Sequence, residues 1–262
     1  MRRLWARRME ESVKLTSKDN HAKFGPLALK VFGASRWFAE FPDEARERLV
    51  RAGRIEKLVR GEVLSRRGQL VTDLAVILDG SLDVSVTSPE GKRLIQVVLE
   101  AGQIMNLIPV LDGQPTIHDA SAHTDLVLLL VNREDFLVES DRDPRVSRAL
   151  MRILCLRSRV LYASLVEAAF LPLRVRCARV LYSLMRQYGV KRGDCIEISL
   201  KLSQEELADM IGRTRQSVNK ELKALEREGV LQMAYSHFVI MDEKALSEIA
   251  LSEGDTKLPE RL

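Results

Sequence analysis

A polar stretch in the C-terminal third of the chain combines basic and amide side chains at helical spacing. It reads LSQEELADMIGRTRQSVNKELKALEREGVLQ and covers residues 202–232. Its second half carries Arg215, Gln216, Asn219 and Lys220. Guanidinium and ammonium groups donate to base edges and phosphates, and amide groups both donate to and accept from base edges. The chemistry that these residues indicate is recognition of DNA rather than catalysis.

The same stretch carries the signals of two short helices joined by a turn. Ser203 followed by Glu206 is the pattern of a capping box, Gly212 permits a tight turn, and Thr214 can cap the second helix. Leu207, Ile211, Val218, Leu222 and Leu225 supply a shared apolar core. We expect a helix-turn-helix whose second helix enters the major groove. Two helices that merely pack together are the alternative.

The DNA-binding unit is expected to cover residues 171–250, with a tail over 251–262. ISLKL, 198–202, predicts a short strand, and VLQMAYSHFVIM, 230–241, predicts a hairpin that makes the unit a winged helix. The predicted DNA-contacting residues are Ser203, Thr214, Arg215, Gln216, Ser217, Asn219, Lys220 and Lys223, with Arg174 and Arg176 as contacts to phosphates.

Residues 35–142 predict a separate unit built mainly from strands. The segment 35–53 has helical periodicity with a fresh start near Pro42. From Arg54 onward, short β-branched runs alternate with glycines, and SPEGK at 88–92 predicts a hairpin turn with positive φ at Gly91. Many short strands at even spacing favour a sandwich or barrel of jelly-roll type. Residues 1–34 show little periodicity and are expected to be a variable extension.

A long helix is expected over residues 143–170, because nothing breaks the pattern between Pro144 and Pro172. It carries two apolar stripes. One contains Val146, Ala149, Ile153, Leu156, Val160 and Ala163, and the other contains Leu150, Leu154, Leu161, Leu165 and Ala168. A helix against one domain needs a single stripe, so a second copy of the chain could cover the other. A thick core-packing face is the alternative.

The charge distribution favours a polyanionic partner. Net charge is +4, but residues 142–192 alone hold 12 basic and 2 acidic side chains. The longest apolar run, LVLLLV at 126–131, is too short for a membrane span, and nothing resembles a secretory signal. We therefore expect a cytoplasmic protein with no membrane partner. The three cysteines lack a CxxC pair, which argues against a zinc site and a disulfide framework.

These segments, in this order, resemble the bacterial regulators of the cyclic AMP receptor and fumarate–nitrate regulator (Crp/Fnr) family. The resemblance covers residues 35–250, including GEVLSRRGQLVTDLAVILDGSLDVS, the long helix and IGRTRQSVNKEL. It implies an α+β fold with a cyclic-nucleotide-binding-like roll, a dimerisation helix and a winged helix-turn-helix. It also implies a homodimer on an inverted-repeat operator, with RNA polymerase as a partner. The dimer contacts would be Leu150, Leu154, Leu161 and Leu165.

The chain departs from the family at the residues that hold cyclic AMP. Members that bind the nucleotide carry Gly-Glu and Arg-Ser in a phosphate-binding cassette. Residues Asn106 and Leu107 stand at the first pair, and Thr116 and Ile117 at the second. On the long helix, Leu161 and Tyr162 replace the Thr-Ser that meets adenine. Leucine and threonine cannot replace the ribose and phosphate contacts, so we expect no cyclic AMP in its usual pose.

Other effectors and functions stay open to different degrees. An iron–sulfur cluster needs cysteines near the N-terminus, whereas the first is Cys155; haem would have to use His118 and His123, which we interpret as surface histidines. The candidate effector pocket consists of Asn106, Leu107, Thr116, Ile117, Leu161 and Tyr162. It could bind cyclic di-GMP or a small apolar molecule, or it could be a filled core that binds nothing. No catalytic or metal-binding set is apparent, so we expect no enzyme. A ligand-binding protein without DNA binding is the alternative from another class.

Overall fold

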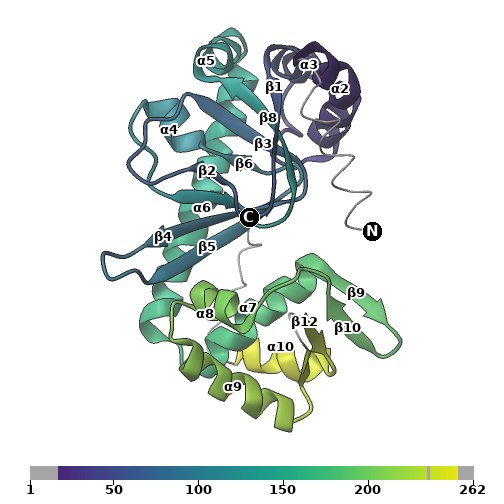
Figure 1. The fold of residues 1–262 in the computed structure, drawn as a ribbon, viewed down its shortest axis with the longest axis vertical. Helices are drawn as coiled ribbons and strands as arrows, with labels where there is room; N and C mark the ends of the chain where they lie inside the picture. The colour runs from purple at the N-terminus through teal and green to yellow at the C-terminus, as the bar shows by residue number, and fades with distance from the viewer. Residues whose placement is uncertain (1–16, 235–236, 253–262) are drawn as a thin grey trace. The chain divides into compact units, whose positions relative to one another are not determined.

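The computed structural model describes residues 17–234 and 237–252 (Figure 1). It divides into two compact units. The first contains Met1–Val84 and Val98–Leu154, and the second contains Ser85–Val97 and Cys155–Leu262. The boundary therefore falls within the long helix that the sequence assigns to dimerisation. Among the helices of the described residues, none has the length and apolar character needed to cross a bilayer.

The roll predicted for the first part of the chain is present as two four-stranded sheets. Their orders are β1-β8-β3-β6 and β2-β7-β4-β5. The strands are β1 (Arg54–Leu58), β2 (Val63–Ser65), β3 (Asp73–Asp79), β4 (Ser81–Thr87), β5 (Arg93–Glu100), β6 (Ile104–Met105), β7 (Asp119–Ala122) and β8 (Leu126–Asn132). At the predicted hairpin turn, Gly91 has φ +79°, and the Ser88 N–H donates to Lys92 O at 2.8 Å.

The core of the roll is centred on the pairing of β3 with β8. Both strands are apolar over most of their length, and Val76 lies opposite Leu129 in an antiparallel register. Unbroken apolar strands are expected where both faces of a sheet are covered. Helices α2 (Ser17–Ala34), α3 (Asp43–Ala52) and α5 (Arg133–Arg142) contact this sheet. The turn after β3 requires glycine at position 80, because a Cβ there would lie 2.2 Å from the Asp125 carbonyl oxygen.

The N-terminal extension differs from the prediction, because residues 17–34 form helix α2. Its Phe32 ring stacks on Phe38 with ring centroids 4.0 Å apart, and Phe38 meets Phe41 edge-on at 5.1 Å. Phe24 lies under the Lys57 ammonium group at 4.8 Å. These contacts hold α2 on the first unit even though its sequence shows little periodicity. The part of the predicted extension over residues 1–16 lies outside the described residues.

Several short elements of the roll were not predicted. They are β6, β7 and helix α4 (Leu107–Asp112), together with α5, which makes the chain helical from Arg133 rather than from residue 143. Strands of two or four residues and a helix of six are too short to leave a periodic signal. Helix α5 does carry a start signal, since Asn132 Oδ1 accepts from the Glu134 N–H at 2.9 Å.

The predicted long helix is present as α6 (Pro144–Phe170), 27 residues without a break. Asp143 accepts a hydrogen bond from the Arg145 N–H at 2.8 Å, so it caps the helix while Pro144 occupies the first turn. The side-chain hydrogen bond from Arg145 lowers the pKa of Asp143, which keeps the cap ionised. Val146, Ala149 and Ile153 are buried, as expected for the stripe that packs on its own chain.

The second unit contains the C-terminal winged helix. Its elements are α7 (Leu173–Tyr188), β9 (Gly189–Arg192), β10 (Cys195–Ile198), α8 (Gln204–Ile211), α9 (Arg215–Arg227), β11 (Leu231–Ala234), β12 (His237–Ile240) and α10 (Glu243–Leu251). The sheet order is β11-β12-β10-β9. The strand predicted at 198–202 is wrong, because β10 ends at Ile198. Helix α10 and the β9–β10 hairpin were not predicted. The centre of the predicted 230–241 hairpin, residues 235–236, lies outside the described residues.

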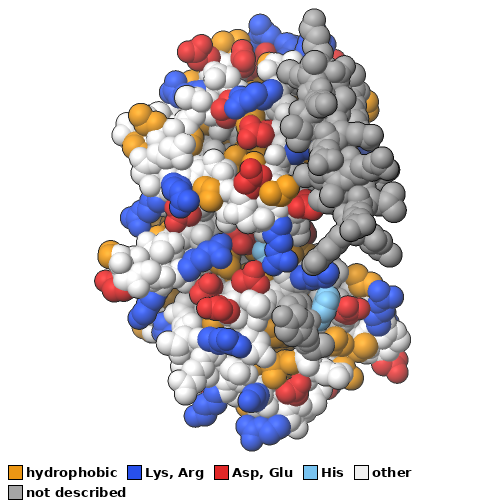
Figure 2. Space-filling model, in the orientation of Figure 1, with side chains coloured by type: hydrophobic (Ala, Val, Ile, Leu, Met, Phe, Trp, Pro, Cys, Tyr) orange, Lys and Arg blue, Asp and Glu red, His pale blue; other side chains and the backbone are white. Residues whose placement is uncertain are grey.

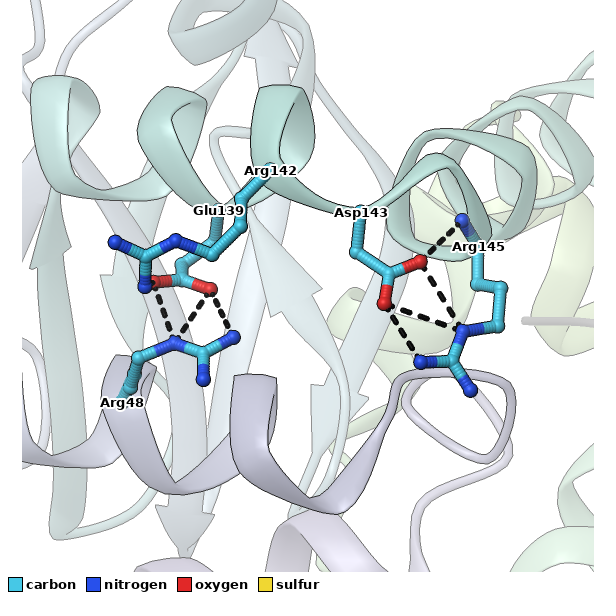
Figure 3. Close-up of polar contacts among 5 residues, drawn as sticks. All are labelled: Arg48, Glu139, Arg142, Asp143 and Arg145. Carbon is cyan, nitrogen blue, oxygen red and sulfur yellow. Dashed lines mark hydrogen bonds and ion pairs between the residues drawn. The ribbon is translucent and has the colours of Figure 1, made fainter.

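A buried carboxylate joins α3 to α5 in the first unit. Arg48 Nε donates to both carboxylate oxygens of Glu139, at 2.8 and 2.9 Å, and Arg142 donates to one of them at 2.9 Å (Figure 3). The hydrogen bond to Glu139 raises the pKa of Arg48. The Glu139 side chain is only 7% exposed, so its charge depends on these two guanidinium groups.

We expect Glu139→Gln to lower the free energy of unfolding by about 1–3 kcal/mol, because a neutral amide cannot satisfy both guanidinium groups. Urea unfolding followed by tryptophan fluorescence measures the change. Glu40→Gln is the matched control, because Glu40 pairs with Arg152 at an exposed site. We expect that control to cost less than about 1 kcal/mol. Equal losses in the two variants would contradict the role assigned to Glu139.

Candidate DNA-binding surface and effector pocket

Helix α8 begins with the predicted capping box. Ser203 Oγ accepts from the Glu206 N–H at 3.1 Å, and Glu206 Oε2 accepts from the Ser203 N–H at 2.7 Å. These bonds satisfy N–H groups that the start of a helix leaves without partners. Ser203 is half-buried, and the observed role of its hydroxyl oxygen is this cap.

The turn between α8 and α9 depends on Gly212, whose φ is +69°. The Gly212 N–H donates to Ala208 O at 2.9 Å, and the Arg213 N–H donates to the same oxygen at 3.2 Å. Bonds of this kind close a helix through one left-handed residue, and glycine adopts that conformation without a steric cost. The turn redirects the chain within a few residues, as a helix-turn-helix requires.

Helix α9 is strongly amphipathic. Thr214 caps it, since Thr214 Oγ1 accepts from the Ser217 N–H at 3.3 Å. Val218, Leu222 and Leu225 are fully buried, and α9 packs against α7, α8 and β11. Burial of the apolar face fixes the rotation of the helix about its axis, so the opposite face is exposed to solvent.

Most of the predicted base and phosphate contacts lie on that exposed face. Arg215, Gln216, Ser217, Lys220 and Lys223 are all exposed. Basic side chains gather over α9 in the lower part of Figure 2. A helix that presents such donors from its N-terminal half is suited to enter the major groove.

Asn219 differs from its neighbours on α9. It is half-buried, and its Oδ1 atom is buried without a hydrogen-bond partner among the described residues. A buried amide oxygen without a partner carries a desolvation cost. In the free protein, therefore, Asn219 does not extend fully into solvent as predicted for a base contact.

The two predicted phosphate contacts on α7 have partners inside the domain. Arg174 forms a two-point ion pair with Glu228, with the first contact at 2.9 Å. Arg176 is half-buried, and its guanidinium donates to the Ile211 carbonyl at the end of α8. Arg174 is therefore neutralised within the domain, whereas Arg176 helps to hold the helix-turn-helix.

A buried arginine that the sequence pattern did not reveal joins three helices of the second unit. Arg179 is 2% exposed; its Nε donates to Ala250 O at 2.8 Å, and its Nη1 lies 3.1 Å from Glu167 Oε1. The bonds connect α7 with the end of α10 and the last turns of α6. In the sequence, the burial of Arg179 is indicated only by its place inside the apolar run CARVLYSL, which does not predict its partners.

The cassette residues are mostly part of the packed roll. Leu107 is 1% exposed, Thr116 is 2% exposed, and Asn106 is buried with φ +65°. The Thr116 backbone pairs with Gly68 and Gln69 at 2.8 and 2.9 Å. Asn106 Nδ2 donates to Asp73 O at 3.3 Å.

Ile117, the fourth predicted cassette residue, is half-exposed. Leu107 and Thr116, in contrast, are packed inside the roll. Asn106 Oδ1 has no hydrogen-bond partner among the described residues. Of the four predicted pocket residues in the roll, three are therefore buried and one, Ile117, is half-exposed.

The exposed apolar residues of α6 match the predicted dimer contacts only in part. Leu150 is buried in its own chain and Leu154 is half-buried, whereas Leu161 and Leu165 are 59% and 66% exposed. Tyr162 is 72% exposed. Leu161 and Tyr162 belong to the second unit and the cassette residues to the first, so no single unit assembles the predicted pocket.

The histidine and cysteine side chains weighed as ligands for haem or iron lie in different environments. The interpretation of His123 as a surface residue is wrong, because it is buried with Nδ1 3.2 Å from Asp83 Oδ1. Burial raises the pKa of Cys177 to about 12, which keeps it a neutral thiol. Cys155 is exposed and Cys195 is half-buried.

Two family models match the chain. One is described as a Crp-like helix-turn-helix domain and matches residues 175–249; the other is described as a cyclic nucleotide-binding domain and matches residues 55–143. Together they cover the winged helix and most of the roll.

Relatives and solved structures agree with this assignment. The chain is 29% identical over 191 residues to the cyclic AMP receptor protein of Thermus thermophilus, covering 73% of this chain and 85% of that relative. It is 23% identical over 191 residues to the CRP-like cAMP-activated global transcriptional regulator of Mycobacterium tuberculosis, with the same coverage.

Two solved structures share the fold at lower identity. The c-di-GMP responsive global regulator CLP of Xanthomonas campestris has a TM-score of 0.69 and 18% identity, covering 77% of this chain and all of that one. A CooA mutant from Carboxydothermus hydrogenoformans has a TM-score of 0.67 and 21% identity, covering 85% and 95%. The capped helix-turn-helix, the roll and these matches lead to one conclusion: the chain belongs to the Crp/Fnr family of DNA-binding transcription regulators, which are not enzymes.

Proposed function

We propose that this transcription regulator binds an inverted-repeat operator as a homodimer and reads it with the N-terminal half of α9. The observation that carries the proposal is the exposed set Arg215, Gln216 and Lys220, on a helix whose opposite face is fully buried. Half-sites roughly 34 Å apart, one helical turn, would place two copies of α9 in successive major grooves. RNA polymerase is the further partner that we expect, and the cytoplasm is the expected location.

The proposed dimer contact is the exposed apolar face of α6. Met151, Leu154, Leu161 and Leu165 recur at intervals of three, seven and four residues, with Ser158 between the inner two. This spacing is the a/d pattern of a two-stranded coiled coil. Three of these apolar side chains are more than half exposed in the single chain, so a second copy would remove them from water.

The sensor is proposed not to take cyclic AMP in the usual pose. Supporting observations are the burial of Leu107 and Thr116 and the absence of the cassette carboxylate and arginine. We expect haem and an iron–sulfur cluster to be absent as well. A second candidate is a regulator that binds cyclic di-GMP or another small molecule near the roll and α6; the buried Asn106 Oδ1 without a partner is the observation in its favour.

Selection of bound sequences from random duplexes tests the DNA proposal and the rival ligand-binding function without DNA. Gln216 can donate to N7 and accept from N6 of adenine, whereas glutamate accepts from cytosine N4. We therefore expect Gln216→Glu to shift one position of each half-site toward cytosine, by about 1–3 kcal/mol. Lys223→Ala is the control, because the loss of a phosphate contact weakens binding to all sequences alike. An unchanged sequence logo for Gln216→Glu would reject base reading by this residue.

Leu165→Glu is expected to shift the protein from dimer to monomer in sedimentation velocity at micromolar concentration and to weaken operator binding with it. A charged side chain in the apolar seam would be desolvated in both copies. Val138→Glu is the matched control, since Val138 is 53% exposed on α5, outside the long helix. A Leu165→Glu dimer with wild-type operator affinity would contradict the proposed seam.

Millimolar cyclic AMP is expected to leave the unfolding temperature unchanged. A ligand that binds only the folded state at 100 times its Kd would add about 2.7 kcal/mol. Differential scanning fluorimetry measures the shift, and cyclic di-GMP serves as the parallel ligand. A clear rise with cyclic AMP would overturn the interpretation of Leu107 and Thr116.

A further inference from the structure

Two arginines approach each other at the turn of the helix-turn-helix. Arg176 reaches from α7 and donates to the Ile211 carbonyl, and Arg213 Nη1 donates to the next carbonyl in sequence, Gly212 O, at 3.1 Å. The two guanidinium groups are thereby anchored on consecutive peptide units of the turn. Arg213 is exposed and was not among the residues predicted to contact DNA.

The two positive charges oppose each other. Burial first, and then the charge of Arg213, lower the pKa of Arg176. Cys177 and Glu167 act weakly in the other direction. Glu167, however, is already engaged by Arg179 at 3.1 Å.

Three other arginines of the same unit form ion pairs within it. Arg174 pairs with Glu228, Arg179 with Glu167 and Arg192 with Glu197. Among the described residues, no ion pair joins Arg176 or Arg213 to a carboxylate. The turn thus holds two anchored guanidinium groups whose mutual repulsion an external anion would relieve.

The anion that fits this place is a backbone phosphate of DNA. A guanidinium has five N–H donors in a planar fork, so a single bond to a carbonyl leaves donors for phosphate oxygens. In a helix-turn-helix, the first helix crosses the DNA backbone while the second enters the groove. The end of α8 and the turn after it are therefore the part of the motif that the backbone passes.

We propose that Arg176 and Arg213 together form a phosphate-binding site on the DNA backbone at the turn between α8 and α9. The site rests on the proposed operator binding, and it adds affinity without sequence information. The two arginines differ in one respect: Arg176 joins α7 to the end of α8, whereas Arg213 donates to Gly212 O, the carbonyl of the preceding residue.

The test measures binding of the full chain to labelled duplexes by fluorescence anisotropy over a KCl series. One duplex carries the selected operator, and the other is an unrelated sequence of equal length. Arg213→Gln is expected to weaken both by the same factor. The slope of log K against log [KCl] should lose about 0.9 for each phosphate contact removed, hence about 1.8 for a dimer.

Two further variants sharpen the result. Arg192→Gln is the matched control, because it removes the same charge from an exposed arginine of the same unit that pairs with Glu197; its slope should equal that of the wild type. Arg213→Lys retains the charge but not the fork, so it should recover most of the slope and only part of the affinity.

Thermal unfolding separates a binding role from a structural one. Removing Arg213 relieves Arg176 of a like charge, so the unfolding temperature of Arg213→Gln should stay unchanged or rise. A lower temperature would assign Arg213 to folding and overturn the proposal.

The binding data can also overturn it. A slope that Arg213→Gln leaves unchanged, or that Arg192→Gln reduces equally, rejects the site while leaving operator binding intact. A changed sequence logo would make Arg213 a base reader and reject the phosphate assignment. Absence of any sequence-specific duplex binding by the wild type would reject the proposed operator binding and this site together.

Discussion

The left-handed backbone at Gly212 is the constraint on which the DNA-binding face depends. It ends α8, starts α9 three residues later and fixes the angle between the two helices. Caps at Ser203 and Thr214 hold the two helix starts, while Val218 and Leu222 fix the rotation of α9. With the turn, the two caps and the buried side chains in place, the exposed face of α9 has one orientation relative to its own domain. Local backbone conformation thus determines which side chains can meet a base.

Charge pairing then determines which arginines remain available to an anion. Helix α6 and the first turns of α7 are rich in arginine, which alone would suggest a uniform basic surface. In the fold, Glu228 neutralises Arg174 and Glu167 engages the buried Arg179. The same carboxylates that stabilise the domain therefore select which positive charges lie open at its surface.

The sensor unit depends on a different balance. The roll has an apolar core that includes Leu107, and helices anchored through Glu139 and the Phe32–Phe38–Phe41 stack cover one of its sheets. Burial of Leu107 and its apolar neighbours stabilises this unit through the area removed from water. The fold of this unit is that of the family.

Sequence periodicity determined the order of the parts: a strand-rich roll, an unbroken helix from Pro144 and a helix-turn-helix with its capping box. These follow from local signals, namely caps, glycines and apolar spacing over many residues. The tertiary structure alone decided the rest. Helix α2 and the short α4 and β7 exist because neighbours bury them, and the burial of Leu150 and His123 depends on contacts between residues far apart in sequence. Likewise, no local pattern can show that Arg174 is neutralised while Arg213 stays open, because each charge depends on partners that only folding brings near.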